Sequence, residues 1–201
     1  MKLKQVGAIC KEAGIFMLYD QYGDDGKVTG QWLGTGCAIF KLSGLPLIGE
    51  DHIAALFGFT EKQLGKLLVK RGTLPGSINF DDTDPAEVAL DDGEITFAYG
   101  KYTARPLVTR QGLEFIDNKF LTPLSDDTDY LMIYERSTAN GQTYFALKIG
   151  LMIVGVVMPL NIIEDKFVES VEALAKKART ALEHKKEQDA QRKKGAADEE
   201  D

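Results

Sequence analysis

The chain has 201 residues, of which 44% are hydrophobic and 27% are charged, and its formal net charge is −7. This length and composition are typical of a globular protein with its own core. The negative charge argues against a simple nucleic-acid-coating protein, which would be basic. The only two cysteines, Cys10 and Cys37, have apolar neighbours and predict buried free thiols in a reducing compartment. No secretory signal is recognised, and the longest apolar run, residues 149–160, is about half of a membrane span. We therefore expect a cytoplasmic protein without a membrane partner.

The first part of the chain predicts a helix, three strands and two more helices. Apolar residues recur at helical spacing from Leu3 to Cys10, and Gly14 is a suitable helix end. Thr60 is a suitable N-cap for the last of these helices. The expected strands are 15–19, 27–33 and 37–42, and the expected later helices are 50–57 and 61–71.

The rest of the chain predicts further strands and ends in a long helix. Expected strands lie at 77–80, 87–90, 95–99 and 102–108, followed by a helix at 112–121 and a second strand set at 130–160. From about residue 163, an apolar helix face includes Phe167, Val171, Leu174 and Ala178. After Leu182 the helix is nearly all polar, and we expect a disordered acidic tail from residue 195.

Two stretches of the chain have the same order of short motifs. Tyr19 and Tyr134 end similar apolar strands, Pro46 and Pro159 lie in Leu-Pro-Leu and Met-Pro-Leu, and Glu50 and Glu164 each precede an aspartate. These pairs are 115, 113 and 114 residues apart, and small loop insertions explain such drift. A unit used twice at this period indicates a pseudo-symmetric α+β body. The competing interpretation is a chance match between short apolar patterns.

Charge is distributed unevenly along the sequence. Residues 81–94 contain seven carboxylates and no cation, which indicates a solvated acidic loop; a divalent-cation site there is the less favoured alternative because no EF-hand pattern is present. Cations gather instead where we expect helices. They are Lys2, Lys4 and Lys11 near the start, Lys62, Lys66, Lys70 and Arg71 in the segment 61–71, and eight Lys or Arg residues from Lys176 to Lys194.

Motifs for catalysis are missing from the sequence. His52 and His184 have no second histidine or cysteine at metal-ligand spacing, so we expect both to face solvent. Gly34-Thr35-Gly36 leads into a strand rather than a helix, so we interpret it as a turn or bulge and not as a phosphate cradle. We expect no catalytic residue, no metal and no cofactor.

The order of these elements resembles that of the DNA sliding clamps, the ring-shaped processivity factors of replication. The features that carry this resemblance are the opening Met1-Lys2-Leu3 helix, the hairpin at 94–100 and two strand-to-proline segments, Gly44-Leu45-Pro46-Leu47 and Val157-Met158-Pro159-Leu160. The resemblance implies an α+β fold of duplicated helix-plus-antiparallel-strand modules, a homo-oligomer and sequence-independent DNA association. It departs from the clamps after Pro159, where a charged helix replaces the strands that would complete a second domain. The size and composition also resemble those of phage or prophage proteins.

The leading hypothesis is therefore a non-catalytic, clamp-like replication accessory protein. Its DNA contacts would come from phosphate-binding cations. These cations are Lys2, Lys4, Lys11, Lys62, Lys66, Lys70 and Arg71. The alternative hypothesis is a protein–protein adaptor or assembly component of a phage-like system, with the long helix as a docking element.

The expected domain organisation has three parts. Residues 1–110 form a first α+β module with extra hairpins, and residues 111–182 form a shorter second module. Residues 183–201 form a charged helix end and the acidic tail.

Overall fold

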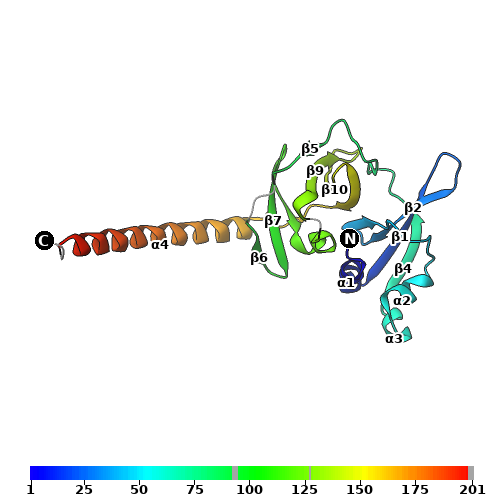
Figure 1. Ribbon diagram of the computed structural model, residues 1–201, viewed down its shortest axis with the longest axis horizontal. Helices are drawn as coiled ribbons and strands as arrows, with labels where there is room; N and C mark the ends of the chain where they lie inside the picture. The colour runs from blue at the N-terminus through cyan, green and yellow to red at the C-terminus, as the bar shows by residue number, and fades with distance from the viewer. Residues whose placement is uncertain (92–94, 127, 199–201) are drawn as a thin grey trace. The chain divides into compact units, whose positions relative to one another are not determined.

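The computed structural model describes residues 1–91, 95–126 and 128–198, and it divides the chain into two units, residues 1–160 and 161–201. The first unit combines short helices with two sheets (Figure 1), so the expected α+β class is confirmed. Its helical elements are α1 (Leu3–Ala13), α2 (His52–Phe57), α3 (Glu61–Leu64), and the 3-10 helices η1 (Asn118–Leu124) and η2 (Thr128–Tyr130). Its strands are β1 (Ile15–Tyr22), β2 (Val28–Gly34), β3 (Ala38–Lys41), β4 (Leu68–Thr73), β5 (Val88–Ala89), β6 (Phe97–Tyr99), β7 (Tyr102–Thr109), β8 (Gly112–Asp117), β9 (Leu131–Ser137), β10 (Thr143–Ile149) and β11 (Met152–Val157).

The larger sheet has eight strands in the order β4-β1-β2-β3-β11-β10-β9-β5. Two antiparallel meanders, β1-β2-β3 and β9-β10-β11, meet in its middle through the antiparallel pair β3–β11. At one edge β4 pairs with β1 in parallel, and at the other β5 pairs with β9. The smaller sheet is the antiparallel set β6-β7-β8.

The larger sheet is buried on both faces. One face packs against α1, η1 and the β7–β8 hairpin, in a cluster that includes Val6, Phe16, Phe145 and Leu121. The other face includes Trp32, Tyr144 and Ile153 and packs against side chains of residues 74–80, which have no regular secondary structure. We call residues 74–91 the covering segment. Successive side chains of a strand point to opposite faces of the sheet, so apolar residues of β9, β10 and β11 contribute to both of these hydrophobic clusters.

The expected helix at 61–71 is wrong. The helix α3 ends at Leu64, and β4 begins four residues later and pairs with β1 through Val69 and Phe16. Gly65 follows directly after α3, and glycine costs a helix interior about 1 kcal/mol relative to alanine. Pairing with a buried strand outweighs the weak helical pattern of Leu67-Leu68.

Two other expectations also fail. The helix expected at 112–121 is instead the strand β8 followed by η1, because Gly112 adopts a φ of 120° in a hairpin turn and β8 pairs with β7 along its length. The strand expected at 77–80 lies in the irregular covering segment.

The turn expected at Gly34-Thr35-Gly36 is confirmed: β2 ends there, and the Thr35 hydroxyl accepts hydrogen bonds from the Cys37 and Ala38 amides.

The expected boundary at residue 110 falls in the turn between the paired strands β7 and β8. Strands from both expected modules also share the larger sheet, so the first unit runs to residue 160. The second unit contains the helix α4 (Asp165–Asp198), 34 residues long. This confirms the expected long C-terminal helix, which continues past residue 195, where we expected disorder. No helix in the described part of the chain has both the length and the apolar composition to cross a membrane.

Deleting residues 186–201 is expected to leave the melting temperature of the first unit unchanged. The described side chains of this stretch, residues 186–190, are all exposed, so their removal costs no buried contact. Thermal unfolding followed by circular dichroism checks this. A fall of more than about 3 °C, equivalent to about 1 kcal/mol at this size, would show that the deleted end stabilises the fold.

Candidate functional site

A groove with a volume of about 650 Å³ lies between α1 and residues 56–59. We call it the α1 groove. The two helices that supply lining residues, α1 and α2, are both drawn close to β4 in Figure 1. The lining of the groove consists of Leu3, Lys4, Gly7, Ala8 and Lys11 from α1, and Leu56, Phe57, Gly58 and Phe59 from the end of α2 and the residues after it.

Aromatic side chains form the apolar wall of this groove. Phe57 and Phe59 stack with their ring centroids 5.8 Å apart, and both contact the buried Phe16 of β1, at 5.4 and 5.5 Å. A Cβ atom added at Gly7 would overlap the Phe57 ring, so the helix backbone lies directly against that ring. The wall is therefore fixed by the core beneath it, and aromatic rings in such contact hold a defined geometry.

Cations lie on the α1 side of the groove. Lys4 and Lys11 are seven residues apart, which places them on one face of α1, and both are exposed. The Lys11 ammonium lies 5.8 Å from the centroid of the Phe59 ring, within reach of a cation–π interaction. An apolar wall with ammonium groups at its rim suits a ligand that is both apolar and acidic.

The seven cations expected to bind DNA have different environments. Lys4 and Lys11 line the α1 groove, whereas Lys62, in α3, and Lys66, just after it, follow the groove-lining Phe59 in the chain. Lys70 and Arg71 lie in β4 and not on the helix that we expected. No single helical face therefore carries all seven side chains.

Two of these seven cations form ion pairs with described residues of the first unit. Lys2 forms a salt bridge with Asp126 at 2.7 Å and donates a hydrogen bond to Ser125. Arg71 donates two hydrogen bonds to Asp20, from Nε at 2.8 Å and from Nη2 at 3.1 Å. Burial of Asp20 alone would raise its pKa, but hydrogen bonds from Arg71 and Gln31 outweigh burial and hold the pKa below its ordinary value. Arg71 is thus committed to a buried carboxylate.

A second cavity, of about 240 Å³, lies between α1, β8 and residues 158–160. Its charged centre is Lys119, whose ammonium lies 2.8 Å from a Glu12 oxygen and 3.2 Å from an Asp117 oxygen. Cys37 also lines it and is exposed, in contrast to the burial that we expected. Glu12 and Asp117 thus share the single ammonium group of Lys119.

The remaining chemistry-bearing residues have structural environments. Burial raises the pKa of the Cys10 thiol to about 12, so this cysteine is inert at neutral pH. The expected exposure of the histidines is confirmed: the side chains of His52 and His184 are 61% and 71% exposed. Within the described ranges, no group of three or more His, Cys, Asp or Glu side chains could hold a metal ion.

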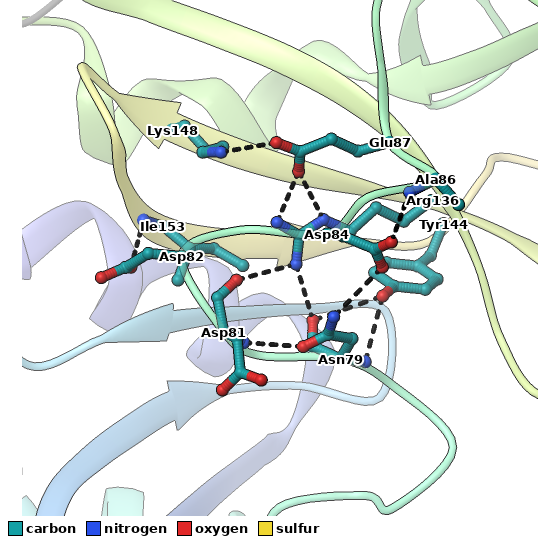
Figure 2. A network of polar contacts seen from close by, with 10 residues as sticks. All are labelled: Asn79, Asp81, Asp82, Asp84, Ala86, Glu87, Arg136, Tyr144, Lys148 and Ile153. Atoms are coloured by element: carbon teal, nitrogen blue, oxygen red, sulfur yellow. Dashed lines mark hydrogen bonds and ion pairs between the residues drawn. The ribbon is translucent and has the colours of Figure 1, made fainter.

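The acidic stretch that we expected to be solvated is bound to the sheet over most of its described length (Figure 2). Arg136 of β9 is buried, and it donates two hydrogen bonds to the Glu87 carboxylate, from Nε at 2.8 Å and from Nη2 at 2.5 Å. Its Nη1 donates two more, to the backbone carbonyl oxygens of Asn79 and Asp81. Lys148 of β10 donates to the other oxygen of Glu87 at 2.7 Å. We call Glu87, Arg136 and Lys148 the buried charge cluster. Residues 92–94 of the expected acidic loop lie outside the described residues.

Other carboxylates of this stretch complete the attachment. Asp82 accepts a hydrogen bond from the Ile153 amide of β11, and Asp84 accepts from Ala86 and Asn79 within the covering segment. The Tyr144 hydroxyl both donates to the Asn79 carbonyl and accepts from its amide. The described carboxylates of the acidic run therefore position the covering segment over the sheet. Sequence reasoning missed this because Arg136 and Lys148 lie about 50 to 60 residues away in strands.

Comparisons of the chain with protein-family models, curated proteins and solved structures find no match. The assignment of a function therefore rests on the geometry of the α1 groove and the distribution of charge.

Replacing Glu87 with Gln is expected to destabilise the protein by about 3 kcal/mol, because it leaves two buried cations without a carboxylate. At this chain length the melting temperature should fall by about 10 °C. Burial would raise the pKa of Glu87, but hydrogen bonds from Lys148 and Arg136 lower it below its ordinary value of 4.5. The stabilisation is thus present above about pH 4.5 and is lost as the pH falls through the lower folded-state pKa.

Thermal melts of both proteins between pH 7 and pH 3 measure this. The E87Q variant should lose less stability than the wild type over the acid range. Asp81→Asn is the matched control, since this side chain is exposed and only its backbone carbonyl binds Arg136. Equal melting temperatures for E87Q and D81N at pH 7 would contradict the assigned role of the cluster.

Proposed function

We propose that this protein is a non-catalytic interaction module that binds an acidic, apolar segment of a partner protein in the α1 groove. The observation that carries the proposal is the combination of a preformed aromatic wall, Phe57 and Phe59, with two exposed ammonium groups, Lys4 and Lys11, around one cavity. This is the adaptor or assembly role that the sequence offers as its alternative.

The lining of the groove suits a docking peptide. One wall is the helix α1, and grooves beside a helix commonly accept an amphipathic segment whose anchors repeat every three or four residues. Each buried Leu- or Phe-sized anchor contributes about 1.5–3 kcal/mol, before the cost of ordering the peptide. Two or three anchors therefore support micromolar binding, which is typical of an adaptor.

The exposed lysines in and near this groove favour acidic over basic segments among ligands of similar apolar content. Lys4, Lys62 and Lys66 have no ion-pair partner in the described part of the chain, and Lys11 contacts only the Phe59 ring by a charge interaction. A ligand carboxylate near α1 gains attraction without displacing an internal partner. A basic segment of the same apolar content is repelled by the same lysines.

In this proposal, two similar strand meanders form the scaffold that carries the α1 groove. The two meanders occupy equivalent stretches: β2 and β10 lie 115 residues apart at both ends, and β1 and β9 nearly so. Gly26 and Gly141 both adopt positive φ in the turns after the first strand. Asp20 and Glu135, also 115 residues apart, are both buried carboxylates that bind an arginine, Arg71 and Arg110 respectively. These correspondences support a clamp-like duplication with α1 as the accessory helix of the first copy.

DNA association is a second candidate function. Five of the seven expected cations remain outside ion pairs among the described residues. Lys4 and Lys11 line the α1 groove, and Lys62 and Lys66 come a few residues after its lining residue Phe59 in the chain. Phosphate binding by such lysines is independent of base sequence and weakens steeply with salt. Since Lys2 and Arg71 are paired internally and no single helical face carries all seven expected cations, protein docking is the better supported function.

Peptide selection tests the proposed function directly. Random peptides of about 12–16 residues, enough for three or four helical turns, are displayed and selected on the wild-type protein. We expect enriched peptides to combine carboxylates with Leu or aromatic anchors. Ala8→Arg places a long side chain into the groove, and binding should fall about tenfold or more, measured by fluorescence anisotropy of a synthetic enriched peptide.

Gln5→Arg is the matched control, because it adds the same side chain to the same helix at an exposed position that does not line the groove. Enriched peptides that bind A8R and wild type equally would overturn the proposal. A labelled DNA duplex at about 50 mM salt provides the second arm. Binding to DNA that is lost in Lys4→Glu/Lys11→Glu, with no groove-dependent peptide, would favour the DNA function instead.

A further inference from the structure

In the second unit, the helix α4 carries an exposed apolar stripe. In α4, Val168, Val171 and Leu182 expose 43%, 43% and 52% of their surface, and the small side chains of Ala175 and Ala178 lie between them in sequence. These five residues follow one another at spacings of 3, 4, 3 and 4. This is the heptad spacing of a coiled-coil seam, with 168, 175 and 182 as a positions and 171 and 178 as d positions.

The charges beside this stripe change sign along the helix. In this frame the e positions are Asp165, Glu172, Arg179 and Lys186, so two acidic positions are followed by two basic ones. All four side chains are exposed, and none has an ion pair in the described part of α4. Residues at e and g commonly determine the partner and orientation of a coiled coil.

An antiparallel copy of the same helix matches this pattern. When Val171 packs against Leu182 of the partner subunit, Ala175 packs against Ala178 of the partner subunit. The apolar layers of this register are therefore formed by residues 171, 175, 178 and 182, and Val168 lies opposite the methylene stem of Lys185 of the partner subunit. In this register Glu172 faces Arg179 of the partner subunit, and Asp165 faces Lys186 of the partner subunit. Twofold symmetry repeats both ion pairs, giving four in total.

A parallel pair lacks this complementarity. There each e position meets a g position of the other helix, and the g positions nearest the seam are the apolar Leu174 and Ala181. In the antiparallel register these same two residues face each other and extend the apolar contact. From residue 165 to residue 186 the paired region is about 33 Å long, or about three heptads.

We propose that α4 is a self-association element that pairs antiparallel with the α4 helix of a second copy of this chain. The inference is independent of the α1 groove, because it uses only residues of the second unit. It gives the expected homo-oligomer a specific interface and a stoichiometry of two.

Sedimentation velocity of the full-length protein at concentrations of about 1–100 µM tests the pairing. A concentration-dependent monomer–dimer equilibrium is expected, and Leu182→Asp should remove the dimer by placing a carboxylate in the seam. Thr180→Asp is the control, since Thr180 is exposed on the outer face of the same helix and should leave the dimer unchanged. A monomer at every concentration, or a dimer that L182D does not weaken, would overturn the proposal.

A charge exchange tests the orientation. Glu172→Arg and Arg179→Glu should each weaken the dimer about tenfold, because each turns two attractive pairs into repulsive ones. The double variant E172R/R179E restores opposite charges across the antiparallel interface and should recover the wild-type equilibrium. The two positions lie seven residues apart on one helix, about 10 Å, too far for this recovery to arise within a monomer. A double variant that dimerises no better than the single variants would overturn the antiparallel assignment.

Discussion

The buried charge cluster is the interaction on which the rest of the first unit depends. Within the described part of the first unit, the second face of the eight-stranded sheet packs against the covering segment, which contains little regular secondary structure. Glu87 binds Arg136 and Lys148 from two adjacent strands, and Arg136 also binds two backbone carbonyls of the segment. A buried cation of this kind is stable only when its donors are matched, so it fixes one position of the covering segment over the sheet.

The same arrangement explains an unusual division of charge in a protein of net charge −7. Several of its carboxylates neutralise buried cations or accept backbone hydrogen bonds, as Asp20, Asp82, Asp84 and Glu87 do. Several of its lysines, in contrast, remain exposed on or near α1 and α3. The surface around the α1 groove is therefore more positive than the composition implies, and net charge alone is a poor guide to the partners of this protein.

The success of sequence reasoning depended on whether a signal was local. The meander strands were recognisable because each is a buried apolar run bounded by turn residues, such as Gly26 and Gly141 with their positive φ. The strand β4 was not recognisable: its partner β1 is about fifty residues away, and nothing in Leu67–Arg71 distinguishes a parallel edge strand from an apolar helix. For the same reason Lys4 and Lys11 were identified as candidates while the wall they adjoin, Phe57 and Phe59, was missed. Pairing across the chain creates the groove, and one sequence does not show which segments will pair.

The junction between the two meanders has a consequence for how the chain folds. β3 and β11 pair through three residue pairs, from Phe40–Gly155 to Ala38–Val157, and the paired residues lie more than a hundred positions apart in the sequence. Closing so large a loop is entropically costly and makes folding slow relative to a protein with local contacts. During synthesis, residues of β1, β2 and β3 leave the ribosome well before residue 152 does. The apolar edge at Ile39 and Phe40 therefore remains unpaired until β11 has been made. An open apolar edge of this kind favours aggregation, so we expect the interval before β11 is made to be the stage at which the chain is most prone to it.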